Sequence, residues 1–393
     1  MQVNHSFWVA TLLFTTYVQA EDYVTTQFMF YDEDAETTKI VAPSLEVNLD
    51  FGNDYTLNSK FSVDSVSGAS KIFYDKSYDA SSGASPYRHG KSNPSAFARG
   101  QEVNSNDIRY GLVDYYDIRF FGGFNLTKRF ESRDEMSVGV SYNNEYDYHI
   151  PEASLSYMHW LDERKNSSIE GSFAMQRGDV LLWCSENSEC DTNSGASKIY
   201  HQYIYNASLS YAQTIDAKSQ AKITLFGASE AGYLNNQYMN VVRNKSGRLF
   251  IENELRPDRR KAYGAKLTYA RAVDDKLTLH GSYRYYRDDW EISSHTIESE
   301  IYYEYNNKLT FEGALRYYTQ SSAEFYSGRS DYFTTEKYAS SDLRLGEMNS
   351  MNYLLGMDYK SSSNMNHYFM VDYYEQDNDT YAISLIVGQK YRF

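Results

Sequence analysis

The last thirteen residues of the chain, 381–393, alternate between apolar and mostly small or polar side chains. One face carries Tyr381, Ile383, Leu385, Val387, Tyr391 and Phe393, interrupted only by Gln389. A period of two residues predicts a β-strand. An apolar face of this length with aromatic residues at both ends is typical of a strand that crosses a membrane in a β-barrel. The alternative at this point is an ordinary amphipathic strand of a soluble sheet.

The same alternation recurs along the chain and predicts about sixteen strands, most of them about ten to thirteen residues long, which is the length that a tilted membrane strand needs. They are expected near residues 24–31, 40–50, 55–66, 115–128, 134–145, 148–161, 167–177, 200–214, 217–230, 261–272, 276–287, 294–305, 309–320, 348–359, 364–375 and 381–393. No segment shows a convincing helical period. We therefore expect an all-β fold, a transmembrane antiparallel up-and-down β-barrel.

The connections between these strands sort by length. Those after even strands are turns of about two to five residues, as in the periplasmic turns of outer-membrane barrels. The long connections, 67–114, 178–199, 231–260 and 321–347, all follow odd strands. An outer-membrane barrel has this pattern because its external loops are long, and an even strand count returns the C-terminus to the periplasm.

The two faces of the strands agree with this interpretation. In the strand expected at 217–230, Ile223 and Leu225 alternate with Gln220 and Lys222. A Lys or Arg on the lipid face costs about 2–4 kcal/mol near the membrane midplane. We therefore expect the charged faces to line the lumen.

The composition fits such a barrel. Tyr accounts for 40 of the 393 residues, and Tyr suits both strands and the membrane interface. The mean hydropathy of −0.64 is low, but a barrel strand is apolar on one face only and its loops are polar. The net charge of −15 argues against nucleic acid as a partner, because phosphates are bound by Lys and Arg.

Residues 1–20 resemble a secretory signal peptide, which leaves residues 21–393 as the barrel domain. The apolar core, Phe7 to Val18, is too short for a spanning helix, and a small-x-small cleavage site ends at Ala20. The alternative is a buried helix of a cytosolic protein. In an exported protein we expect Cys184 and Cys190, which share one polar connection, to form a disulfide. A metal or redox pair is the alternative for these cysteines.

The sequence contains no G-x-S-x-G, H-E-x-x-H, phosphate-loop or EF-hand motif. We therefore predict no catalytic, cofactor or metal site and no enzyme activity. The alternative is a membrane lipid hydrolase built around His159 or His280, because a Ser–His triad is spatial rather than sequential. Alternation places His280 on the lumen face with Ser282 and Arg284, where a hydrogen-bonded lumen residue is the simpler interpretation.

The richest set of charges is predicted on the inward faces of the four strands between residues 261 and 320. The set comprises Lys266, Arg284, Glu298, Glu300, Glu312 and Arg316. Such charges either pair across strands and support a watery lumen, or form a ring that selects ions or solutes. Because about sixteen strands can enclose an aqueous channel, we predict a porin-like passive diffusion channel for small solutes. The alternative is a plugged barrel that serves as a surface binding or structural protein through its long loops.

Four segments are distinctive: VDSVSGAS at 63–70, RPDRR at 256–260, YRYYRDDW at 283–290 and SSDLRL at 340–345. In their order and spacing they resemble a family of uncharacterised Gram-negative outer-membrane β-barrel proteins, a domain of unknown function. The chain departs from the family pattern directly after Leu345, where the sequence GEMNS follows. The resemblance implies a barrel and no assigned activity.

These features predict a location in the outer membrane of a Gram-negative bacterium, in contact with outer-membrane lipid and lipopolysaccharide. The terminal Phe393, with Tyr391 before it, resembles the signal read by the barrel-assembly machinery. We expect that machinery to insert the chain.

Overall fold

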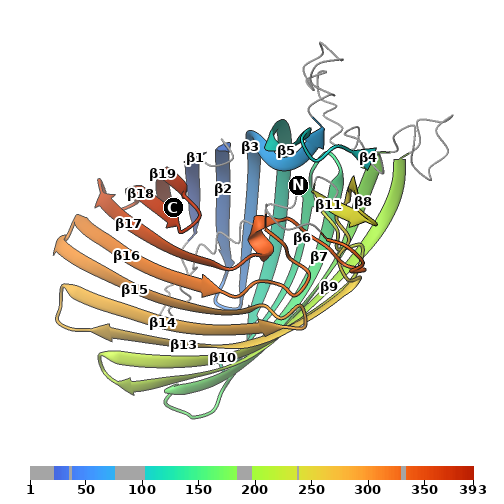
Figure 1. Ribbon diagram of the computed structural model, residues 1–393. Helices are drawn as coiled ribbons and strands as arrows, with labels where there is room; N and C mark the ends of the chain where they lie inside the picture. The colour runs from blue at the N-terminus through green and yellow to red at the C-terminus, as the bar shows by residue number, and fades with distance from the viewer. Residues whose placement is uncertain (1–21, 35–37, 76–101, 184–196, 237–238, 329–332) are drawn as a thin grey trace.

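The protein is a closed antiparallel β-barrel of sixteen strands in a computed structural model that describes residues 22–34, 38–75, 102–183, 197–236, 239–328 and 333–393 (Figure 1). The barrel strands are β1 (Tyr23–Glu33), β2 (Lys39–Phe51), β3 (Tyr55–Asp75), β5 (Ile108–Arg129), β6 (Glu135–Asn144), β7 (Tyr148–Trp160), β8 (Ser167–Trp183), β9 (Ser197–Asp216), β10 (Ser219–Gly232), β13 (Arg259–Ala272), β14 (Leu277–Asp288), β15 (Ser293–Asn306), β16 (Leu309–Gln320), β17 (Met348–Lys360), β18 (Met365–Gln376) and β19 (Thr380–Arg392). The first and last strands pair from Tyr23↔Arg392 to Glu33↔Ala382, which closes the barrel and leaves no exposed edge.

The sequence-based prediction of sixteen alternating strands is confirmed, since each predicted segment overlaps one barrel strand. The sorting of connections by length is also confirmed, because the long ones all lie at the same end of the barrel. Two of the predicted connections were too long. Residues 178–199 were expected to be loop, but β8 runs to Trp183 and β9 begins at Ser197. Residues 67–114 were expected to be loop, but β3 and β5 stay paired through that region, as far as Asp75↔Ile108. The continuous backbone ladder holds this extension together where the SGAS sequence shows no apolar alternation.

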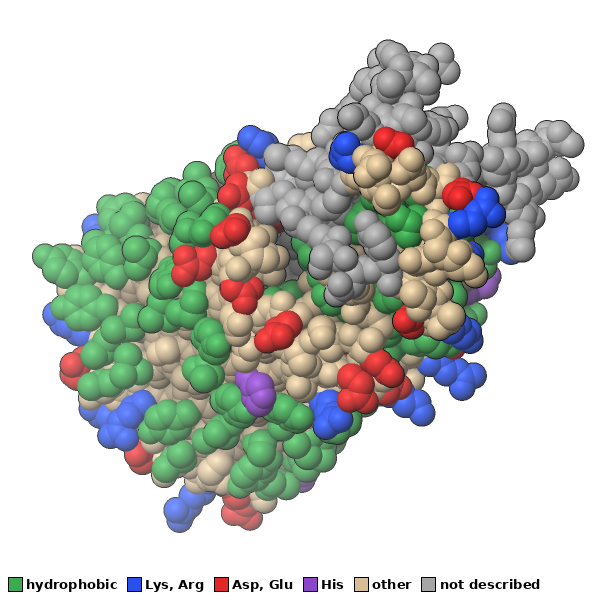
Figure 2. Space-filling view, in the orientation of Figure 1, with side chains coloured by type: hydrophobic (Ala, Val, Ile, Leu, Met, Phe, Trp, Pro, Cys, Tyr) green, Lys and Arg blue, Asp and Glu red, His purple; other side chains and the backbone are tan. Residues whose placement is uncertain are grey.

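The outer face of the barrel is apolar, as the alternation predicted. Figure 2 shows hydrophobic side chains gathered over the outside of the strands. Leu355 on β17 is 72% exposed, and Val140 and Leu225 are each 55% exposed on strands around the circumference. Water would penalise such a surface, whereas the hydrocarbon of a bilayer accepts it. Within the described residues, no helix is long and apolar enough to cross a membrane.

Three short strands, β4 (Glu102–Val103), β11 (Asn240–Lys245) and β12 (Arg248–Asn253), form a second, separate sheet in the order β11-β12-β4. The sequence analysis did not predict it. The connection between β16 and β17 carries one 3-10 helix, η3 (Leu343–Leu345), capped by the Asp342 side chain. Two segments, 233–258 and 321–347, contain β11, β12 and η3, and we call their described residues the cover.

The cover reaches from one wall of the barrel to the opposite wall. On one side, the backbone N–H of Phe73 in β3 donates to the Asn240 side chain at 2.8 Å. On the other side, Phe325 packs edge-to-face on Trp290 of the turn between β14 and β15, with ring centroids 5.1 Å apart. β3 and β14 lie eight strands apart in the ring of sixteen, so these contacts are on opposite sides. The cover therefore lies across the external mouth.

The main apolar clusters also lie at this end. One comprises Leu234, Trp290, Ile292, Ala323, Phe325 and Leu345, and a second comprises Phe73, Val103, Val242, Leu249 and Ile251. The cover thus has a hydrophobic core of its own, while the barrel wall below it is lined by polar side chains.

Candidate functional site

The six charged residues predicted to face the lumen lie on the inner wall, on β13, β14, β15 and β16, and the structure divides them into groups. Glu298 lies between two cations: Lys266 Nζ is 3.2 Å from its Oε2 and Arg316 Nε is 3.3 Å from its Oε1. Ser282 donates a third contact to the same carboxylate at 2.8 Å. Glu298 on β15 therefore holds one cation of β13 and one of β16 in fixed positions.

Glu300 and Glu312 form the second group. They lie nearer the periplasmic end, one inward position beyond Glu298 on β15 and two beyond Arg316 on β16. The Tyr302 hydroxyl lies 3.1 Å from Glu300 and 3.2 Å from Glu312. His280 Nδ1 is 3.2 Å from Glu300 Oε2. Arg284 belongs to neither group, because its guanidinium stacks on Phe226, 4.7 Å from the ring centroid.

These charged side chains retain contact with open space. The side chains of Lys266, Glu298 and Arg316 are 36%, 25% and 40% exposed, although the outside of the same strands is apolar. Next to this set, Lys222 of β10, the strand that pairs with β13, forms an ion pair with Glu170 of β8 at 3.0 Å, and their side chains are 39% and 31% exposed. A solid barrel interior would bury such groups completely. Part of each of these side chains therefore faces open space inside the barrel.

The cover is held by an ion-pair network that the sequence analysis missed. Arg256 pairs with Glu254 at 2.6 Å and with Asp342 at 2.7 Å. The Glu254 side chain has no exposed surface, and that of Asp342 has 2%. Ser340 also donates to Glu254 at 2.5 Å. This network joins the two segments of the cover to each other.

The pKa values of the two buried carboxylates in the network, Asp342 and Glu254, are shifted in opposite directions. Burial alone would raise the pKa of Asp342, but the guanidiniums of Arg344 and Arg256 outweigh burial and hold that pKa below its ordinary value. Burial raises the pKa of Glu254, which Arg256 only partly offsets. Asp342 is therefore the carboxylate whose charge keeps the network together.

A second fixed point lies where β14 meets the cover. Arg260 on β13 donates to Asp288 Oδ2 from Nε at 2.9 Å and from Nη2 at 2.6 Å. Asp288 Oδ1 accepts from the backbone N–H groups of Trp290 and Ile292, both at 3.0 Å. This one buried carboxylate thereby fixes the turn that carries Trp290 against Phe325.

These contacts give the distinctive segments a structural role. RPDRR supplies Arg256 and Arg260, RDDW supplies Asp288 and Trp290, and SSDLRL supplies Asp342. VDSVSGAS supplies Asp64, which pairs with Arg119 of the next barrel strand. The opposite charges in these four segments are the sequence signal from which these ion pairs could have been predicted.

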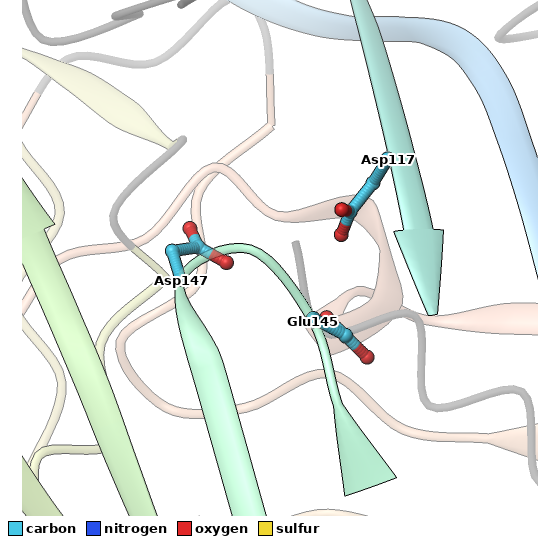
Figure 3. A group of neighbouring side chains, drawn as sticks. All are labelled: Asp117, Glu145 and Asp147. Carbon is cyan, nitrogen blue, oxygen red and sulfur yellow. The ribbon is translucent and has the colours of Figure 1, made fainter. Parts of the chain in front are cut away.

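Three carboxylates meet near the mouth, at the turn between β6 and β7. Figure 3 shows Asp117 of β5 with Glu145 and Asp147, whose oxygens lie within 4.8 Å of one another. Burial raises the pKa of Glu145 to about 7, which lessens the repulsion in the group. Arg119 Nη1, 3.9 Å from Glu145, offsets part of the remaining negative charge.

The two histidines considered for a hydrolase lie far from each other around the barrel, on β7 and β14. His159 Nδ1 is 3.0 Å from Asp134 at a periplasmic turn. His280 lies in the lumen beside Glu300, as described above. Neither arrangement brings a serine nucleophile to a histidine base in the described hydrogen bonds.

The remaining predicted features lie at the ends of the chain or in undescribed segments. Tyr391 and Phe393 are on the outer face, 46% and 58% exposed, and their rings are stacked with centroids 6.1 Å apart. Cys184 and Cys190, and the predicted signal peptide, lie outside the described residues.

A family model described as "Protein of unknown function (DUF3570)" matches residues 10–389. The chain belongs to this family. This agrees with the resemblance to an uncharacterised family that the four segments suggested. Comparison with curated proteins finds no match.

Several solved outer-membrane structures resemble the chain weakly. The toluene transporter TodX of P. putida is 9% identical over 96% of this chain and 91% of that chain, with a TM-score of 0.43. OccK5 (OpdH) of Pseudomonas aeruginosa is 12% identical over 95% and 98%, with a TM-score of 0.43. A bacterial polysaccharide outer membrane secretin is 7% identical over 96% and 99%, with a TM-score of 0.49. Likenesses this distant give no basis for a function of this chain.

Proposed function

We propose that the protein is an outer-membrane channel with a water-filled lumen whose external mouth is narrowed by the cover. The observation that carries this proposal is the partial exposure of charged side chains on the inner wall, such as Lys266 and Arg316. Paired charges that keep a quarter or more of their surface open need water beside them. The solutes are small and polar or charged, because the lumen wall offers ion pairs and hydroxyl groups rather than an apolar surface.

The proposed channel lies in the outer membrane of a Gram-negative bacterium, with its apolar belt in contact with lipid and lipopolysaccharide. Residues 1–20 direct its export as a cleaved signal peptide. We also propose a disulfide between Cys184 and Cys190.

The test of this proposal is solute flux into liposomes that contain the refolded protein without residues 1–20. We expect flux of small ions and monosaccharides, and slow or no flux of trisaccharides, because the cover narrows the mouth. Liposomes with heat-modifiable, folded protein that admit none of these solutes would contradict the proposal.

A second candidate function is a plugged barrel that binds a partner through its loops. The observation in its favour is the hydrophobic core of the cover, which gives the external surface a fixed shape. The flux measurement separates the two candidates, since a plugged barrel passes no solute.

We predict that mild acid leaves the cover closed and that stronger acid loosens it. Because the folded pKa of Asp342 is depressed, its contribution to stability is present above its ordinary value of 3.8 and is lost as the pH falls through the folded pKa. The pKa of Glu254 is raised, so Glu254 takes up its proton at a higher pH than Asp342 does. That protonation removes a buried charge and does not weaken the cover. Hydrogen exchange of peptides from 239–256 and 333–347, corrected for intrinsic rates, should not rise between pH 7 and about pH 4 and should rise below it. Loosening already near pH 6 would contradict this assignment.

The C-terminal signal gives another prediction. We propose that Phe393 and Tyr391 are read by the barrel-assembly machinery, since both are exposed on the outer face at the strand that closes the barrel. Deleting Phe393 should lower the amount of folded protein in outer membranes several-fold. Replacing Phe393 with Trp, which keeps a terminal aromatic ring, is the control and should restore it. Equal membrane levels of the deletion and the full chain would exclude this role.

A further inference from the structure

Arg284 differs from other arginines of the inner wall. Arg119, Arg260 and Arg316 each pair with a carboxylate of the barrel. No carboxylate of the described residues lies within 4.0 Å of Arg284, and its guanidinium contacts rings instead: Phe226 at 4.7 Å and Tyr286 at 5.4 Å. A half-buried guanidinium without a fixed anion is unfavourable unless another group supplies the negative charge.

The strands around Arg284 are built to hold this stacked position. Gly264 on β13 pairs directly with Phe226 of β10 in the sheet. A Cβ at residue 264 would collide with the Phe226 ring and with the backbone oxygen of Tyr285. Only glycine therefore lets the Phe226 ring occupy the space on which the guanidinium stacks. The stacking fixes the plane of Arg284 and leaves its N–H edge available to a ligand.

The charge around Arg284 favours an anion. Lys266 is its register partner on β13, and Arg316 lies two strands away on β16. Glu298 pairs with both Lys266 and Arg316, and Asp372 of β18 acts on Arg316 from farther along the wall. Three cations therefore face two carboxylates, which leaves a net positive charge at this level of the lumen. The carboxylates Glu300 and Glu312 lie nearer the periplasmic end, so the cationic level lies between them and the cover.

The aromatic surface selects among anions. Phe226 and Tyr286 flank the guanidinium, and Tyr286 also packs against the apolar cluster of the cover. On β16, the guanidinium of Arg316 lies over the ring of Tyr318, 5.9 Å from the ring centroid. We propose that Arg284 is an anion-binding station of the lumen for small organic carboxylates with an apolar or aromatic body. This inference rests on the proposed water-filled lumen, since the solute must reach the inner wall.

The test measures binding rather than transport, with benzoate as the probe and purified, folded protein in detergent. Isothermal titration should show saturable benzoate binding at millimolar concentrations in the wild-type protein. Arg284→Met keeps a long side chain on the Phe226 ring and removes the charge, and it should weaken benzoate binding tenfold or more. The matched control is Arg287→Met, three residues along β14, where Arg287 points outside and pairs with the exposed Glu291. It should bind benzoate like the wild type.

Titrations with two further ligands define the ligand class. Benzamide, which has the ring without the charge, and inorganic phosphate, which has the charge without the ring, should each bind at least tenfold more weakly than benzoate. If Arg284→Met fails to fold, Arg284→Lys tests the same point, because a lysine keeps the charge but loses the planar fork and should weaken binding. Equal benzoate affinity in wild type and in a folded Arg284 variant overturns the proposal, as does equal affinity for benzoate and benzamide. Titration in detergent does not require conduction, so the two proposals can fail separately. Benzoate binding without solute flux would refute the channel and support the binding site at Arg284. Solute flux without benzoate binding would support the channel and refute the binding site.

Discussion

Replacing Arg256 with alanine is expected to release the cover from the mouth of the barrel. The substitution leaves the Glu254 carboxylate, which has no exposed surface, without its cation, and removes one of the two arginines beside Asp342. Breaking a buried ion pair by removing one partner costs about 3–5 kcal/mol. That free energy comes from the contact between the two cover segments and not from the barrel strands. Hydrogen exchange of residues 239–256 and 333–347 should therefore accelerate by at least a hundredfold, while that of β13–β16 stays slow.

The control for this prediction is Arg287→Ala. Arg287 and Glu291 also form an ion pair at the mouth, but their side chains are 48% and 59% exposed. Exposed pairs contribute about 0–1 kcal/mol, so this variant should exchange like the wild type. Unchanged protection of the cover in Arg256→Ala would mean that its hydrophobic clusters alone hold it in place.

Replacing Leu355 with arginine is expected to prevent most of the protein molecules from forming a stable barrel. Leu355 lies in the middle of β17 and is the most exposed of the large hydrophobic side chains on the outer face. An Arg at that depth on the lipid face costs about 2–4 kcal/mol. In bilayers, Leu355→Arg should show a lower denaturant midpoint and less heat-modifiable protein than the wild type.

The neighbouring residue supplies a matched control. Leu354 precedes Leu355 and faces the lumen, where it pairs in register with Asp372 of β18. Leu354→Arg introduces the same side chain on the watery side and should fold nearly as well as the wild type. Equal losses in the two variants would contradict the assignment of the two faces.

The barrel was predictable because the pattern of each strand depends only on its own contacts with lipid and with water. A strand between lipid and water must alternate, and a closed sheet must return to its start, so alternation and the parity of loop lengths specify most of the fold. The extension of β3 to Asp75 was missed because a two-stranded ribbon beyond the membrane needs no apolar face. The sheet of β4, β11 and β12 was missed for a related reason, since β4 joins β12 from a distant part of the chain.

The candidate site was predictable only in part. Alternation placed Lys266, Arg284 and Glu298 on the inner wall, but it carries no information about which charges meet. The lumen charges had been interpreted as one cluster of mixed sign, whereas the geometry separates a cationic level at Arg284 and Arg316 from an acidic level at Glu300 and Glu312. The pairing of Arg256 with Asp342 joins residues 86 positions apart, a distance over which periodicity says nothing.

Single-channel conductance in planar bilayers is the most direct test for a water-filled lumen narrowed by the cover. Wild-type protein and Arg256→Ala, both refolded without residues 1–20 and shown to be heat-modifiable, are recorded in the same salt. We expect discrete steps for the wild type and larger or noisier steps for Arg256→Ala. Silence from both folded proteins would mean that the lumen is closed below the cover, and it would contradict the proposed channel.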